Sequence, residues 1–347
     1  MFEIIKKHPK IFWGIIITIV AVSLLGAWQR RQYMKNPYEN QIGNPPREGD
    51  VVEDTFYYNQ LKDKEKTAYD TIKNAIENFK GGEIEFQTPL NGEEYARVSQ
   101  ALECGQEDYF YAIVDIPMNK NSQNVSYTTK NVLDIKDNVI KKCMLFLYPA
   151  EGIDIQGEID DDGYVQNLQK LKQPLNTMNE NRKNKVLKMK EETERTLDDV
   201  VAKMPKEYGK KEAIDYFLHW MDKNLKLDEE LMKSTDKITS MSHAFEEVYF
   251  KSHSSCVTMD KATASGFTKV LTRLCNKAGI PAYMVIGNWG MEQAYTMTCV
   301  DFDGKKVYID ASGYKKGDLW EQRYISETLL MRKMDIISYF EYGMKED

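Results

Sequence analysis

Histidine is the residue type that this sequence has least of. The 347 residues include 4 histidines, and none of them follows His253. Imidazole is the side chain most often used to move a proton at neutral pH. The chain beyond His253 therefore has no such group for general acid or base chemistry.

A disulfide framework and a basic surface are also missing. The cysteines number 5, scattered over a long chain, and an odd number leaves at least one unpaired in a monomer. The formal net charge is −7, and the lysines are interspersed with acidic residues. Such a surface does not attract polyanions, so we do not expect nucleic acid as a partner. Cysteine usage leaves the redox compartment undecided.

Long apolar runs are absent except at the N-terminus, where Ile11–Trp28 carries no charge. As a helix this run would be about 27 Å long, close to the thickness of the hydrocarbon core of a bilayer. No small-x-small cleavage site follows it, and Gln29-Arg30-Arg31 is a poor flank for cleavage. We expect an uncleaved signal-anchor and a single-pass protein of the cell membrane. Residues 1–10 would form a cytoplasmic tail and the C-terminal domain would be extracellular, as in a bacterial cell-surface protein.

The rest of the chain has the composition of folded protein, with 42% hydrophobic and 29% charged residues, and is long enough for two domains. A linker rich in proline and glycine occupies residues 29–50. An α+β accessory region is expected over residues 51–204 and a second domain over residues 205–347. In the accessory region the patterns predict helices and an antiparallel meander. The predicted helices are Tyr57–Phe79, Asn91–Leu102 and a charged, solvated Leu175–Met204, and the predicted strands are Tyr109–Ile116, Asn124–Leu133 and Val139–Tyr148.

No metal and no cofactor is expected. Glu158–Gly163 has the alternating oxygens of a calcium loop, but Gln169 stands where the loop needs a bidentate Glu. His253 and Cys256 lie three residues apart, without the second ligand pair of a zinc site. Cys275 and Cys299 fall in apolar patterns and are expected in the core.

The second domain contains a predicted helix followed by three strands. Apolar residues recur at helical spacing from Phe267 to Cys275, and Gly279 with Pro281 supplies a stop near Ala278. Strands are then predicted over Ala282–Ile286, Gln293–Phe302 and Lys306–Asp310, with a tight turn at Asp303-Gly304.

These residues resemble the transglutaminase-like superfamily, papain-like α+β enzymes with a Cys on the first turn of a helix and a His and an Asp on neighbouring strands. The family's pattern G-K-x-x-C-x-G-[YF]-[AT] lies over residues 260–268. Its helix end lies over Leu274–Ala282, its glycine is Gly287, its H-A-[WY] falls on Gln293-Ala294-Tyr295, and its "dGkWyhvDpt" falls on Asp303–Ser312. Upstream, Ile214–Met221 and Ser252–Cys256 also resemble family segments, so the resemblance covers about Pro205–Gly343.

The resemblance implies a helix packed on an antiparallel sheet, but two of the three catalytic positions lack the catalytic residue. The nucleophile position is Ala264, the base position is Gln293, and Asp310 alone is retained. Alanine has no sulfur to ionise, and glutamine cannot hold a proton in transit. The neighbouring hydroxyls of Ser265 and Thr263 would still need a base. We therefore read Asp310 as a carboxylate that caps a turn.

Three functions remain open. The first is an inactive transglutaminase-like protein that binds a peptide, a cell-wall component or a protein partner in the old cleft. The expected groove residues are Ser265, Trp289, Gln293, Tyr295, Asp310 and Tyr314. The second is an active cysteine-dependent peptidase or transglutaminase with a displaced nucleophile such as Cys256. The third is a structural scaffold without a ligand.

Overall fold

The computed structural model describes twelve stretches of the chain: residues 53, 55–105, 108–115, 139–147, 178–228, 252–259, 262–289, 293–302, 304–313, 323–326, 330 and 334–336. The predicted membrane anchor, the linker, the strand Asn124–Leu133, the acidic turn at Glu158–Gly163 and Tyr314 all lie outside them. Within the described stretches, no helix is both long enough and apolar enough to cross a bilayer.

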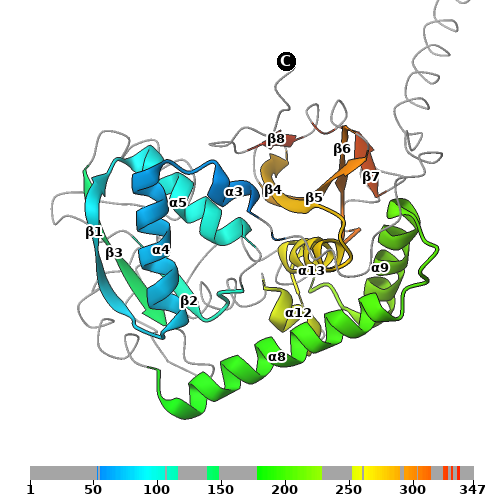
Figure 1. Cartoon of the computed structure of the whole chain (residues 1–347), viewed down its shortest axis with the longest axis horizontal. Coiled ribbons are helices and arrows are strands. Elements are labelled where there is room, and N and C mark those ends of the chain that lie inside the picture. Colours follow the sequence, from blue (N-terminus) through cyan, green and yellow to red (C-terminus); the bar gives the residue numbers. More distant parts are fainter. Residues whose placement is uncertain are drawn as a thin grey trace, which may run out of the picture.

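The first part of the accessory region, up to Leu147, combines helices α3, α4 and α5 with a three-stranded sheet (Figure 1). The sheet is antiparallel throughout, with strand order β1-β3-β2. Its elements are α3 (Phe56–Asn59), α4 (Asp63–Glu77), β1 (Gly82–Leu90), α5 (Gly92–Cys104), β2 (Ala112–Asp115) and β3 (Ile140–Leu147).

Two predictions for this region are corrected. The single helix predicted over Tyr57–Phe79 is two helices, because Lys62 is extended (ψ 162°) and its N–H donates to the buried Glu65 at 2.8 Å, which starts α4. Strand β1 was not predicted. Its residues alternate between the core and solvent, with Ile84 and Phe86 buried.

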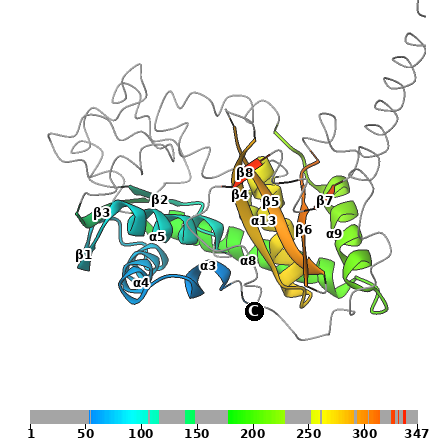
Figure 2. The same cartoon turned by 90° about the horizontal axis from the view of Figure 1, so that it is seen from above.

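Helix α8 (Glu180–Ala202) is the long charged helix, and it does more than present a solvated face. Val186, Thr193, Leu197 and Val200 form a narrow buried stripe along it. Figures 1 and 2 both show α8 running from the accessory region to the second domain, where it packs against α12 (His253–Met259) and α13 (Ala264–Lys277). The helix therefore connects the two halves of the molecule through packing as well as through sequence.

The second domain is the predicted mixture of helices and antiparallel sheet. Helices α9 (Lys210–Asn224), α12 and α13 accompany a five-stranded sheet of order β7-β6-β5-β4-β8. Its strands are β4 (Ala282–Trp289), β5 (Gln293–Phe302), β6 (Lys305–Ile309), β7 (Tyr324–Ser326) and β8 (Met334–Ile336). Every neighbouring pair in this sheet is antiparallel.

The end of α13 follows the prediction closely. The helix ends at Lys277, and Gly279 adopts the left-handed conformation (φ 73°) that glycine accepts without strain. The Asn276 side chain then bonds both the N–H and the C=O of Ala282, each at 2.9 Å. This pair of bonds fixes the angle at which the chain leaves α13 and enters β4.

Buried apolar side chains form two clusters. The first cluster extends from the accessory region into the five-stranded sheet and includes Ile72, Leu145, Val285, Tyr295 and Tyr308. The second cluster lies between α8, α9, α13 and the sheet and includes Leu197, Phe217, Val270 and Phe302.

Direct contacts join the two regions across the first cluster. The rings of Phe56 and Tyr283 stack with centroids 3.8 Å apart, and the Tyr57 hydroxyl donates to the Met284 carbonyl. The accessory region therefore packs directly on the second domain.

Candidate functional site

The position that corresponds to the nucleophile lies at the N-terminus of α13. Thr263 is the extended N-cap residue, and Ala264 is the first residue of the helix. Ala264 is 4% exposed and belongs to the first cluster, whereas the buried apolar residues that follow it on α13, such as Phe267 and Val270, belong to the second. The start of α13 therefore packs in the first cluster, which also contains Tyr295.

A row of hydroxyls fixes the first turns of α13 against β5. The Thr296 hydroxyl lies 3.4 Å from that of the half-buried Ser265 and 3.1 Å from that of Thr268. One turn further along, the hydroxyls of Thr272 and Thr298 lie 3.2 Å apart. Buried hydroxyls that satisfy one another in this way hold the helix and the strand in one register.

Asp310 follows β6 and is 2% exposed. Its Oδ1 accepts four hydrogen bonds, from the Tyr295 hydroxyl (2.9 Å), the Ser312 N–H (3.2 Å) and hydroxyl (2.9 Å), and the Gly313 N–H (3.0 Å). These bonds close the turn after β6, which is the structural role that the sequence predicted for Asp310.

Gly313 is required by this turn. Its φ is +66°, and a Cβ at this position would lie 2.9 Å from the Arg323 guanidinium. The turn that holds Asp310 is therefore closely packed on its outer side.

The structure changes the interpretation of two further candidates, Tyr295 and Cys256. Tyr295 is 2% exposed and its hydroxyl is bonded to Asp310, so it supports the site from within and does not offer an open face to a ligand. Cys256, the possible displaced nucleophile, is 0% exposed and lies in the second cluster, so its thiol is enclosed by the core.

The other cysteines offer no replacement. All five cysteines of the chain are buried, and burial raises the pKa of the Cys275 thiol well above its ordinary value. A thiol that stays protonated in an apolar core neither attacks a carbonyl nor binds a metal.

The remaining predicted groove residues are placed only by their backbone or not at all. Gln293 opposes Trp289 across the β4–β5 hairpin, and their side chains lie outside the described structure, as does the whole of Tyr314. Their role as groove residues stays a prediction.

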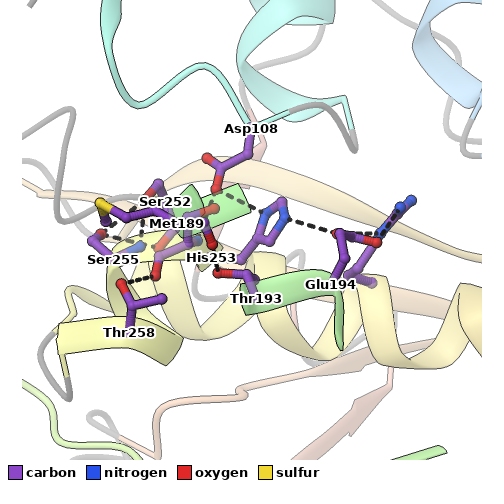
Figure 3. A network of polar contacts seen from close by, with 10 residues as sticks. Asp108, Met189, Thr193, Glu194, Ser252, His253, Ser255 and Thr258 are labelled. Atoms are coloured by element: carbon purple, nitrogen blue, oxygen red, sulfur yellow. Dashed lines mark hydrogen bonds and ion pairs between the residues drawn. The ribbon is translucent and has the colours of Figure 1, made fainter. Parts of the chain in front are cut away.

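A second polar cluster, which we call the His253 network, includes His253 at the start of α12 (Figure 3). The His253 ring sits between two carboxylates, with Nδ1 3.6 Å from Asp108 Oδ2 and Nε2 3.7 Å from Glu194 Oε1. Asp108 Oδ2 also accepts the Ser254 N–H at 2.7 Å. Because Asp108 precedes β2 and Glu194 lies on α8, the network joins three segments that are distant in sequence.

Cations of α13 complete the network. Arg273 and Lys277 lie 2.7 and 2.9 Å from Glu194 Oε2. Burial alone would raise the pKa of Glu194, but the bonds from His253, Arg273 and Lys277 outweigh it and hold that pKa well below the usual range. Glu194 is thus a fixed anion that balances three potential cations.

The sequence analysis named His253, but nothing in the sequence pointed to Asp108 and Glu194 as its partners. Glu194 stood in a charge run that is typical of a solvated helix face, and Asp108 stood alone between helix and strand. Within the described residues, no group of three His, Cys, Asp or Glu side chains is arranged to hold a metal ion. The network is a set of ion pairs that link structural elements.

Comparison with known proteins gives distant matches only. No protein-family model matches the sequence, and no curated protein matches it. Among solved structures, the chain is similar to a transglutaminase at 14% identity, with a TM-score of 0.32, over 60% of this chain and 52% of that one.

Two further solved structures are similar at 12% identity. One is a protein of Cytophaga hutchinsonii provisionally assigned as a cysteine protease, with a TM-score of 0.26 over 43% of this chain and 41% of that one. The other is a protein of Parabacteroides distasonis provisionally assigned as a protease, with a TM-score of 0.25 over 57% of this chain and 37% of that one. The chain thus spans about half of the transglutaminase and less than half of the other two.

Proposed function

We propose that this protein is a membrane-anchored, outward-facing transglutaminase-like protein that does not catalyse acyl transfer and instead binds a peptide, a cell-wall component or a protein partner. The observation that carries the proposal is Ala264 at the first residue of α13. A helix N-terminus stabilises a thiolate, but a methyl group has no charge to stabilise and no electron pair to donate.

The environment of Asp310 supports the same proposal. In a nucleophile–base–acid arrangement the carboxylate orients an imidazole. Here all four described bonds of Oδ1 come from neutral hydroxyls and backbone N–H groups. Asp310 therefore maintains the shape of the turn without orienting a base.

The half-buried Ser265 is the described side chain through which a ligand would reach the site. It directly follows Ala264 and contacts Thr296 of β5. An extended peptide or glycan lying across this point would meet hydroxyl groups that donate and accept hydrogen bonds.

The binding proposal is tested with the full-length chain in a mild detergent. Peptides and peptidoglycan fragments are screened by thermal shift, and we expect one class to raise the melting temperature. Ser265→Trp, which fills the cleft, should abolish that shift, whereas Lys269→Trp, one turn further along α13, should preserve it. Turnover of an amide substrate by the unaltered chain would contradict the proposal, and so would a ligand shift that both variants retain.

The membrane part of the proposal rests on Ile11–Trp28 alone. We expect the full-length chain to fractionate with membranes after alkaline washing, and a chain lacking residues 11–28 to be released. Protease added to intact cells should remove the C-terminal domain. A full-length chain that is washed off membranes, or is protected from external protease, would contradict the anchor or its orientation respectively.

A further inference from the structure

We infer that Tyr295, and not Gln293, occupies the position of the catalytic base, so that Ala264 and Tyr295 together keep the site inactive. The inference deepens the proposed function and rests on it. It also assigns a latent activity, because proton transfer between positions 264 and 295 should be restorable by two substitutions.

The first step is the contact with the acid. A base that takes part in such chemistry is oriented by a hydrogen bond to a carboxylate. In the described structure the side chain of β5 that contacts Asp310 is Tyr295, whose hydroxyl lies 2.9 Å from Oδ1. The strand register agrees with this contact, because Thr298 pairs with Ile309 and so Tyr295 and Asp310 lie near the same end of the β5–β6 ladder.

The second step is the contact with the nucleophile position. Ala264 and Tyr295 both belong to the first cluster. The residues that directly follow them, Ser265 and Thr296, meet through their hydroxyls at 3.4 Å. The first turn of α13 and the start of β5 therefore come together at these two residues.

The third step is the chemistry of the phenol. The Tyr295 hydroxyl donates a hydrogen bond to Asp310, and its oxygen lies 3.0 Å from the Ser312 hydroxyl oxygen. A neutral phenol is a far weaker proton acceptor than imidazole. Tyr295 therefore fills the volume of a base and satisfies Asp310 without being able to accept a proton from a thiol.

The test compares the reactivity of a cysteine placed at position 264. We would prepare A264C, A264C/Y295H and A264C/Q293H and measure alkylation by iodoacetamide at pH 6 by mass spectrometry of the peptide that contains residue 264. In A264C/Y295H the thiol proton passes to the imidazole and leaves a thiolate and an imidazolium side by side. We expect alkylation about tenfold or more faster than in A264C, because the thiolate fraction rises, and no acceleration in A264C/Q293H.

The unaltered chain serves as the control, because it measures the background alkylation of the five buried cysteines. If A264C/Y295H does not fold, A264C/Y295A with added imidazole replaces it, because the truncated side chain leaves room for a free ring. Acceleration in A264C/Q293H, or equal rates in all variants, would overturn the assignment of Tyr295. Hydrolysis by the unaltered chain would sink the proposed function instead, so the two failures are distinguishable.

Discussion

Two buried carboxylate sites in this molecule have opposite surroundings. Asp310 and Asp108 are each 2% exposed. Asp310 is met by hydroxyls and backbone N–H groups, whereas Asp108 faces His253, His253 faces Glu194, and Glu194 pairs with Arg273 and Lys277. The described partners of Asp310 are neutral groups, and the site with an imidazole between two acids joins structural elements.

The difference shows that the presence of residue types used in catalysis does not identify a catalytic site unless their positions are known. His253 has the carboxylate neighbours of a catalytic histidine, yet it lies on α12 and its described contacts lead to α8 and to the residue before β2. Asp310 has the position of a catalytic acid, yet a phenol takes the bond that an imidazole would need. The charged side chains of the His253 network link structural elements, whereas the described partners of Asp310 are neutral.

The largest effect should follow from Asp108→Asn. The change removes a buried charge that accepts the Ser254 N–H and faces His253, so we expect a loss of about 3 kcal/mol in unfolding free energy, measured by urea denaturation. Asp199→Asn is the matched control, because the Lys203–Asp199 pair is exposed and should contribute about 0.5 kcal/mol or less. Equal losses in the two variants would show that the buried contacts of Asp108 contribute no more to stability than an exposed ion pair.

Glu194→Gln should have a smaller effect that depends on pH. The folded-state pKa of Glu194 is lowered, so its contribution is present above the unfolded pKa, about 4.3, and is lost as the pH falls below that value. Since 34% of the Glu194 side chain is exposed, we expect a loss of roughly 1 to 2 kcal/mol at pH 7.

Denaturation of both proteins at pH 7, 5, 4 and 3 tests this expectation. The difference between the unaltered chain and Glu194→Gln should shrink from pH 5 to pH 3. Glu192→Gln, which alters a more exposed pair on the same helix, should show little difference at any pH. A gap that widens on acidification would reverse the sign of the proposed linkage.

Tyr295→Phe addresses the neutral site. The variant keeps the ring and loses one of the four bonds to Asp310 Oδ1, so the unfolding free energy should fall by about 1 kcal/mol. Tyr58→Phe removes a hydroxyl that bonds Asp70 at the surface and should cost only a few tenths. If Tyr295→Phe costs as much as Asp108→Asn, the two carboxylate sites are not energetically different.

The smallest effect is the coupling between Thr272→Val and Thr298→Val. Each single variant should cost about 1 kcal/mol, because it removes a contact between two buried hydroxyls. The double variant should cost less than the sum of the two, because both ends of the bond become apolar together. Strict additivity in this cycle would mean that the two hydroxyls do not interact.

Local patterns predicted the part of the fold that local forces control. The apolar spacing from Phe267 to Cys275 and the stop at Gly279 located α13, and alternation located β5. Strand β1 was missed, although Ile84 and Phe86 alternate with Glu83 and Glu85.

The long-range features had no local signature. Glu194 and Arg273 are 79 residues apart, and nothing in the sequence around either one points to the other. The contact between Tyr295 and Asp310 depends on how β5 and β6 pair, and the sequence analysis had named both residues without connecting them. The assignment of the base position to Gln293 stays a prediction.

The alkylation rate of a cysteine at position 264 tests the central claim most directly. At pH 6, the account predicts that A264C/Y295H reacts about tenfold or more faster than A264C, because a histidine at position 295 would bond Asp310, as Tyr295 does, and on the inference above would accept the proton of the thiol at position 264. Faster reaction of A264C/Q293H, with no gain in A264C/Y295H, would contradict it.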